Sequence, residues 1–170
     1  QRERTVLERV SRSALPGDGL MVVSISYQID AKLVTKRAHG QIMREINRGM
    51  LERWQNRYLP LHFKGGASER YGYKPRGARY VASKRRRVGH NIPLVYTGKL
   101  KTAIQSGVVI RATQYRATLK TKGYFPMREE MRSEIERITQ AERDELVQWA
   151  GKEYLKLAKR PEYSRQRRRK

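Results

Sequence analysis

Residues 64–91 combine basic and aromatic side chains at a density that suits binding to a polyanion. The segment holds nine Lys or Arg residues and one acid, Glu69, so its local charge is +8. Guanidinium and ammonium groups bind phosphate oxygens, and tyrosine rings can stack on bases or pair with cations. The alternative is a solvated loop that keeps the protein in solution. We expect binding through these side chains: Lys64, Arg70, Tyr71, Tyr73, Arg76, Arg79, Tyr80, Lys84, Arg85, Arg86 and Arg87.

A second basic cluster ends the chain, and we expect it to be disordered until it binds DNA or an acidic protein surface. Neither cluster is accompanied by a zinc-finger spacing, an RNP-type aromatic octamer, a GXXG loop or a helix-turn-helix pattern. Any nucleic-acid contact should therefore be independent of base sequence. The terminal cluster consists of Arg165, Arg167, Arg168, Arg169 and Lys170.

Groups that could carry out catalysis are scarce. The chain has no cysteine, and His39, His62 and His90 are too scattered to form a metal-ligand pair. Gly98-Lys99 lacks the surrounding residues of a phosphate-binding P-loop. No nucleophile, base and acid stand in a plausible order. We therefore predict that the protein is not an enzyme and has no metal site and no cofactor.

The net charge of the whole chain also favours binding to a polyanion. Against 39 Lys and Arg residues stand 16 acidic residues, which gives a net charge of +23 over 170 residues. This imbalance favours polyanionic partners. No apolar run approaches the roughly 18 to 20 residues that span a bilayer, and no signal peptide is visible. We expect a soluble protein without a membrane partner.

Hydrophobic spacing indicates the secondary structure of the first half. Apolar residues alternate over 20–29, which predicts a strand with one buried face. Asp30 should cap a long helix that ends at Pro60. Five glycines argue against a regular helix over the basic arm. The apolar stripe of the long helix is Val34, Ala38, Ile42, Ile46, Met50, Trp54 and Tyr58.

The second half predicts a short helix, a hairpin and another long helix. Thr97 should cap the short helix, and strands over 108–113 and 115–121 should turn near Gln114. Thr139 and Glu142 have capping-box spacing, and Pro161 should end the helix that they open. Eight of the 16 acidic residues lie between Glu129 and Glu153, against four basic ones.

The layout of a helix, a long arm, the segment Pro93–Ile104, a strand pair and an acidic helix resembles the virion-morphogenesis proteins of tailed bacteriophages. In this group, tail-completion and head–tail joining subunits carry a similar short motif, which here includes Thr97, Gly98, Lys99 and Leu100. The downstream strand pair and the step Tyr124–Arg128 before the last helix are also similar. The N-terminal strand segment and the basic tail depart from the family pattern.

The resemblance implies an α+β fold, with a small antiparallel sheet packed by two long helices. It divides the chain into an N-terminal extension, 1–19, a single domain, 20–160, and a basic tail, 161–170. The domain includes the extended arm 64–93.

The resemblance also implies a structural role in the virion. A homo-oligomeric ring at the neck, assembled in the host cytoplasm, would join the head connector to the tail around the DNA channel. Its partners would be portal, neck and tail proteins, with non-specific contact to double-stranded DNA. The role could be tail completion, adaptor or terminator. The arm would dock on an acidic face of a neighbouring subunit: Glu130, Glu134, Glu142 and Glu145.

The competing class is a sequence-independent nucleic-acid-binding protein of the ribosomal or nucleoid type. It explains the charge equally well and the basic tail better. It explains less well why half of the acidic residues are concentrated in one region.

Overall fold

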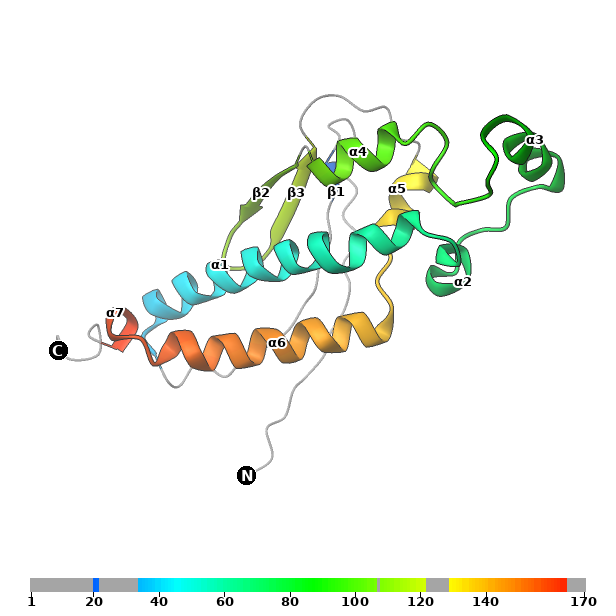
Figure 1. The fold of residues 1–170 in the computed structure, drawn as a ribbon. Helices are drawn as coiled ribbons and strands as arrows, with labels where there is room; N and C mark the ends of the chain where they lie inside the picture. Colours follow the sequence, from blue (N-terminus) through cyan, green and yellow to red (C-terminus); the bar gives the residue numbers. More distant parts are fainter. Residues whose placement is uncertain (1–19, 22–33, 107, 122–128, 165–170) are drawn as a thin grey trace.

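A computed structural model of the chain describes residues 20–21, 34–106, 108–121 and 129–164. The described elements form a mixed α+β arrangement with two long helices and an antiparallel sheet (Figure 1). The N-terminal extension, most of the strand expected over 20–29 and the C-terminal basic cluster lie outside the described residues. Within these residues no helix has the length and apolar character needed to cross a membrane.

The first long helix, α1 (Lys36–Arg53), follows the four-residue apolar spacing of its sequence. Ala38, Ile42, Ile46 and Met50 on this stripe are all buried. The expected N-cap was wrong, because the helix begins after Thr35, whose hydroxyl oxygen accepts a hydrogen bond from the Ala38 N–H at 3.3 Å.

Pro60 does not end the helical path. A π-helical turn, η2 (Trp54–Tyr58), follows α1 directly, and a 3₁₀ helix, η3 (Leu59–Phe63), continues it. Pro60 lies in the first turn of η3, where a missing N–H leaves no hydrogen bond unmade. The helical segment therefore continues to Phe63. Its last buried residues lie directly before the basic arm in the sequence.

The second long helix, α6 (Gln140–Ala158), opens with the predicted capping box. The Thr139 hydroxyl accepts from the Glu142 N–H at 3.2 Å, and a Glu142 carboxylate oxygen accepts from the Thr139 N–H at 3.1 Å. After α6, Pro161 begins the short helix α7 (Pro161–Ser164). The buried apolar stripe of α6 is Leu146, Ala150, Tyr154 and Leu157.

The two long helices pack directly on each other, and Gly49 lies at a close contact between them. A β-carbon built on Gly49 of α1 would lie 2.5 Å from Cη2 of Trp149 on α6. Alanine inside a helix is usually more favourable than glycine by about 1 kcal/mol. At this position the clash should outweigh the gain, because Trp149 is a rigid ring packed between the helices.

We expect Gly49→Ala to lower the free energy of unfolding by about 1 to 2 kcal/mol, the cost of modest overpacking. Urea denaturation measures this change. Gly151→Ala on α6 is the matched control, because a β-carbon there would meet nothing within 4 Å and should add up to roughly 1 kcal/mol. Equal gains from both substitutions would contradict the close approach.

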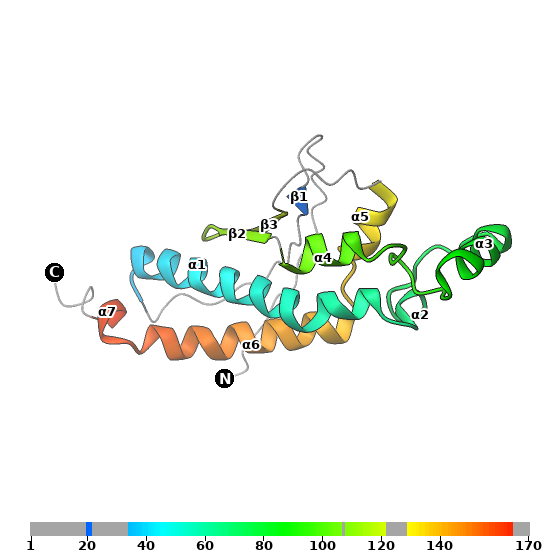
Figure 2. The same cartoon turned by 45° about the horizontal axis from the view of Figure 1, so that its top comes forward.

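A three-stranded antiparallel sheet with the order β1-β3-β2 lies on the opposite side of α1 from α6 (Figures 1 and 2). The sheet therefore packs on α1, and α6 packs on the other side of α1. The predicted hairpin is confirmed, with its loop at residues 113–116, and Asn47 of α1 donates to the Thr113 carbonyl at 2.9 Å. The strands are β1 (Leu20–Met21), β2 (Val108–Ala112) and β3 (Ala117–Thr121).

The basic arm contains regular helices, so the prediction of an irregular segment was wrong. Its helices are α2 (Ala67–Tyr71) and α3 (Ala78–Val88). The glycines stand at helix boundaries, and Gly66, Gly72 and Gly89 have positive φ angles of 80°, 60° and 75°. Gly66 is the N-cap of α2, and Gly72 and Gly89 are the C-caps of α2 and α3, so these glycines mark helix ends that a positive φ allows without a steric penalty.

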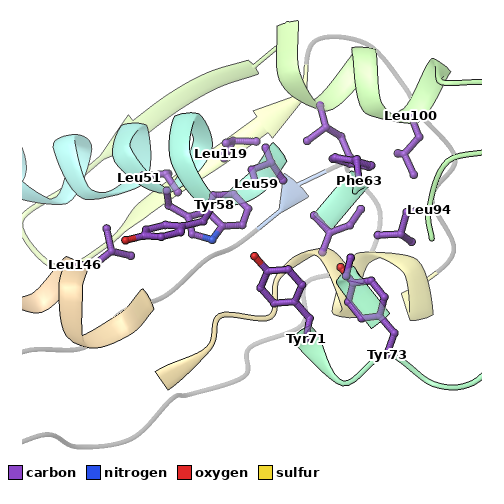
Figure 3. Close-up of a cluster of buried hydrophobic side chains, with 14 of the residues drawn as sticks. Leu51, Tyr58, Leu59, Phe63, Tyr71, Tyr73, Leu94, Leu100, Leu119 and Leu146 are labelled. Atoms are coloured by element: carbon purple, nitrogen blue, oxygen red, sulfur yellow. The ribbon is translucent and has the colours of Figure 1, made fainter. Parts of the chain in front are cut away.

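The remaining helices flank the sheet and the arm. Helix α4 (Lys99–Ser106) is the predicted short helix, and α5 (Glu129–Ile135) precedes α6. Buried residues of α1, η2, η3, α2, α4, α5 and β3 form one continuous core (Figure 3). This core connects the body of the fold to the start of the arm.

Candidate interaction site

The basic arm projects from one end of the fold. In both ribbon views α3 lies at the far end from α7, beyond the end of α1 (Figures 1 and 2). We call residues 70–76 the arm root and α3 the outer helix. The two parts differ in the environment of their charged side chains.

Glu142 anchors the first part of the arm root to the start of α6. Its side chain is only 2% exposed, and one oxygen accepts hydrogen bonds from Arg70 Nε at 3.1 Å and Arg70 Nη2 at 2.8 Å. The same oxygen accepts from the Tyr71 hydroxyl at 2.9 Å. The bond from Glu142 raises the pKa of Arg70. Since Glu142 also closes the capping box, one carboxylate joins the arm root to a helix start.

Glu134 on α5 anchors the second part of the arm root. It is also 2% exposed, and its carboxylate lies 2.5 Å from Arg76 Nη2. Between the two anchors, Arg137 donates to the backbone carbonyl of Tyr71 at 3.1 Å and to that of Gly72. Two buried carboxylates and one guanidinium therefore hold the arm root against α5 and α6.

The tyrosines of the arm root belong to the core. The His62 ring stacks on Tyr71 with 3.7 Å between centroids, and His62 Nδ1 lies 2.5 Å from the Tyr73 hydroxyl. Figure 3 shows Tyr71 and Tyr73 beside the buried apolar side chains. Burial lowers the pKa of His62 to about 4 and raises the pKa values of both tyrosines. These rings are buried in the chain's own core and are therefore not exposed for stacking on bases.

The outer helix presents most of its charge to solvent. Lys84 is the exception: it is 5% exposed, and its Nζ donates to the Ile92 carbonyl at 2.5 Å. Burial lowers the pKa of Lys84. Arg79 is exposed, as is the run Arg85, Arg86 and Arg87, and Tyr80 is 50% exposed. Among the described residues, none of these four arginines takes part in an ion pair.

Other residues expected at the site lie elsewhere. Lys64 and Glu130 are exposed. Glu145 lies 2.5 Å from Arg57 Nη1 and accepts from the Tyr58 hydroxyl at 2.6 Å, and burial together with this bond raises the pKa of Tyr58 to about 12. The acidic face is thus largely engaged within the chain.

The family-like motif forms the start of α4. Gly98 adopts a φ of 78°, and its carbonyl accepts from the Thr102 N–H at 3.0 Å. Leu100 is buried, whereas Thr97 and Lys99 are exposed. The motif residues therefore shape a turn and a core contact.

Sequence reasoning missed two members of the arm's anchoring network, His62 and Arg137, and it also missed the pairing of Arg57 with Glu145 outside the arm. Their partners lie well outside the range of helix or strand periodicity. No local sequence pattern therefore marks these residues. The described residues hold no group of three or more His, Cys, Asp or Glu side chains that could bind a metal ion. No family model matches the chain, and no curated protein or solved structure shows significant similarity to it.

Proposed function

We propose that this protein is a structural subunit of the neck of a tailed-bacteriophage particle. Copies of the chain form a ring that joins the head connector to the tail around the DNA channel, in a tail-completion or adaptor role. The subunit is assembled in the host cytoplasm and stays in the virion. Its function is to bind neighbours, not to catalyse a reaction.

The observation that carries this proposal is the arm, whose root is anchored in the body and whose outer helix projects from it (Figures 1 and 2). A projecting element of this kind suits a subunit that must contact neighbours on several sides. The resemblance of the sequence layout and of the segment around Thr97–Leu100 to virion-morphogenesis proteins supports the same role.

The structure changes one detail of the expected assembly contact. Glu134 and Glu142 pair with Arg76 and Arg70 of the same chain, so they are already engaged before any neighbour arrives. Contacts between subunits therefore use exposed surfaces other than these two carboxylates.

Sedimentation of a native lysate from phage-producing cells tests the proposal. The lysate is treated with nuclease and washed at roughly 0.5 M salt, which screens exposed charge contacts. Mass spectrometry then follows the chain, with the major capsid protein and a host ribosomal protein as markers. We expect the chain to remain with DNA-filled, tailed particles at a fixed ratio to the capsid protein.

Release of the chain together with nucleic acid and the ribosomal marker would overturn the proposal. The sequence-independent nucleic-acid-binding class would then replace it. A chain that stays with particles at a variable ratio would also contradict a ring of fixed size.

A further inference from the structure

The outer helix has two distinct sides. Val81, Lys84 and Val88 follow helical spacing and are partly or fully buried, so they face the chain. Arg79 and Arg86 are seven residues apart, which places them on one outward side about 10.5 Å apart along the axis. The small side chains of Ala82 and Ser83 lie between them, and Arg85 and Arg87 flank the row.

Among the described residues, no acidic side chain forms an ion pair with this outward charge. Arg79 lies in the first turn of α3, where the helix dipole disfavours a cation, and that turn contains no acidic residue. The dipole favours Arg85, Arg86 and Arg87 in the last turn, but no carboxylate pairs with them among the described residues. Three acidic residues of α5 and α6 pair with arginines outside α3: Glu134 with Arg76, Glu142 with Arg70 and Glu145 with Arg57.

These exposed arginines can bind an anionic partner, and the other side chains of α3 indicate what kind of partner it is. A protein partner would need apolar or aromatic anchors at the centre of the contact, yet the only large exposed apolar or aromatic side chain on α3 is Tyr80. A membrane-surface helix would need an outward apolar face, whereas Val81 and Val88 face the chain.

The aromatic residues separate single-stranded from double-stranded nucleic acid. Binding of single strands relies on several rings that stack on successive bases. Tyr71 and Tyr73 are buried beside His62, which leaves Tyr80 alone on the outer helix. Binding to a duplex backbone needs only guanidinium groups at phosphate distance, without stacking.

We propose that the outward face of α3 binds the phosphate backbone of double-stranded DNA without regard to base sequence. The contacts come from Arg79, Arg85, Arg86 and Arg87, with Ala82 and Ser83 allowing close approach. This inference rests on the proposed neck function, in which the subunit surrounds DNA, and it names the partner of the arm.

The salt dependence of DNA binding tests the inference with the purified full-length chain. Fluorescence anisotropy measures affinity for two unrelated 30-base-pair duplexes between about 50 and 200 mM salt. Each neutralised phosphate contributes about 0.9 to the slope of log affinity against log salt concentration. Replacing Arg79, Arg85, Arg86 and Arg87 with alanine should reduce this slope by about 3 to 4 for both duplexes.

The matched control removes the same number of charges from another exposed surface. Lys36, Arg37, Arg44 and Arg48 are exposed on α1, and replacing them with alanine should change the slope by less than about 1. A second variant with lysine at the four α3 positions should keep the slope. Alanine is the best helix former, so loss of α3 is not expected, and circular dichroism checks this.

An unchanged slope in the α3 variant, or equal changes in the α3 and α1 variants, would overturn the inference. Tighter binding to a single strand of the same length, or a strong preference for one duplex, would also overturn it. Particle sedimentation is a separate readout. If the chain stays with particles but the α3 variant keeps the salt slope of the natural chain, only the DNA contact is overturned. If the α3 variant has a reduced slope but the chain is released from particles, only the neck function is overturned.

Discussion

Replacing Glu142 with alanine is expected to lower the free energy of unfolding by about 3 to 4 kcal/mol. The substitution removes charge-assisted hydrogen bonds to Arg70, each typically worth about 1.5 to 3 kcal/mol, and leaves the buried Tyr71 hydroxyl without its acceptor. It also opens the capping box with Thr139, worth about 1 kcal/mol. Arg70 is half exposed, so water recovers part of the loss. Urea denaturation measures the sum.

Glu130→Ala is the control for this prediction. Glu130 belongs to the same acidic run but is exposed, so its replacement should change the free energy of unfolding by no more than roughly 0.5 kcal/mol. If Glu142→Ala and Glu130→Ala had equally small effects, the first anchor of the arm root would contribute nothing to stability.

The protein is expected to lose about 3 kcal/mol of stability as the pH falls from 6.5 to 4. Burial lowers the pKa of His62 from 6.5 to about 4, so the folded chain resists a proton that the unfolded chain accepts in this window. Protonation therefore favours unfolding, and the stability is retained above pH 6.5. The nearby charge of Glu142 acts in the opposite direction, but burial outweighs it. Burial also lowers the pKa of His39, which adds to the loss.

Comparison of the natural chain with His62→Phe isolates this contribution. Phenylalanine keeps a ring against Tyr71 but cannot take up a proton, and it leaves the Tyr73 hydroxyl without its partner. The variant should be less stable at pH 7.5 and should lose less stability on acidification. Chemical denaturation at several pH values gives both curves. Parallel curves for the two proteins would rule out His62 as the source.

Features determined by nearby residues could be predicted from the sequence. The four-residue stripe of α1, the hairpin with its turn at Gln114 and the capping box of α6 each depend on residues a few positions apart. The spacing of apolar residues and the residue types at helix caps were enough to locate these elements. The start of α1 was misplaced because Thr35 offered a cap as good as Asp30.

The arm could not be predicted because its organisation depends on distant contacts and on the position of its glycines. Arg70 and Glu142 are 72 residues apart, and Arg76 and Glu134 are 58 apart, so no local pattern pairs them. The glycines appeared to prevent helices, whereas they lie at the starts and ends of α2 and α3. Tyr71 and Tyr73 are residue types typical of a binding surface, but Tyr71 stacks on His62 and the Tyr73 hydroxyl lies beside the His62 ring, and both are buried in the core.

The two carboxylates that hold the arm root are on different helices, α5 and α6. A segment held at one point can rotate about that point, whereas a segment held at two separate points is restricted in its orientation. The arm root is therefore fixed to the body at two points, and the outer helix begins two residues after the second of them. In the proposed ring, every subunit would carry the same two-point attachment, so the rotational symmetry of the ring would repeat the position of the outer helix around it.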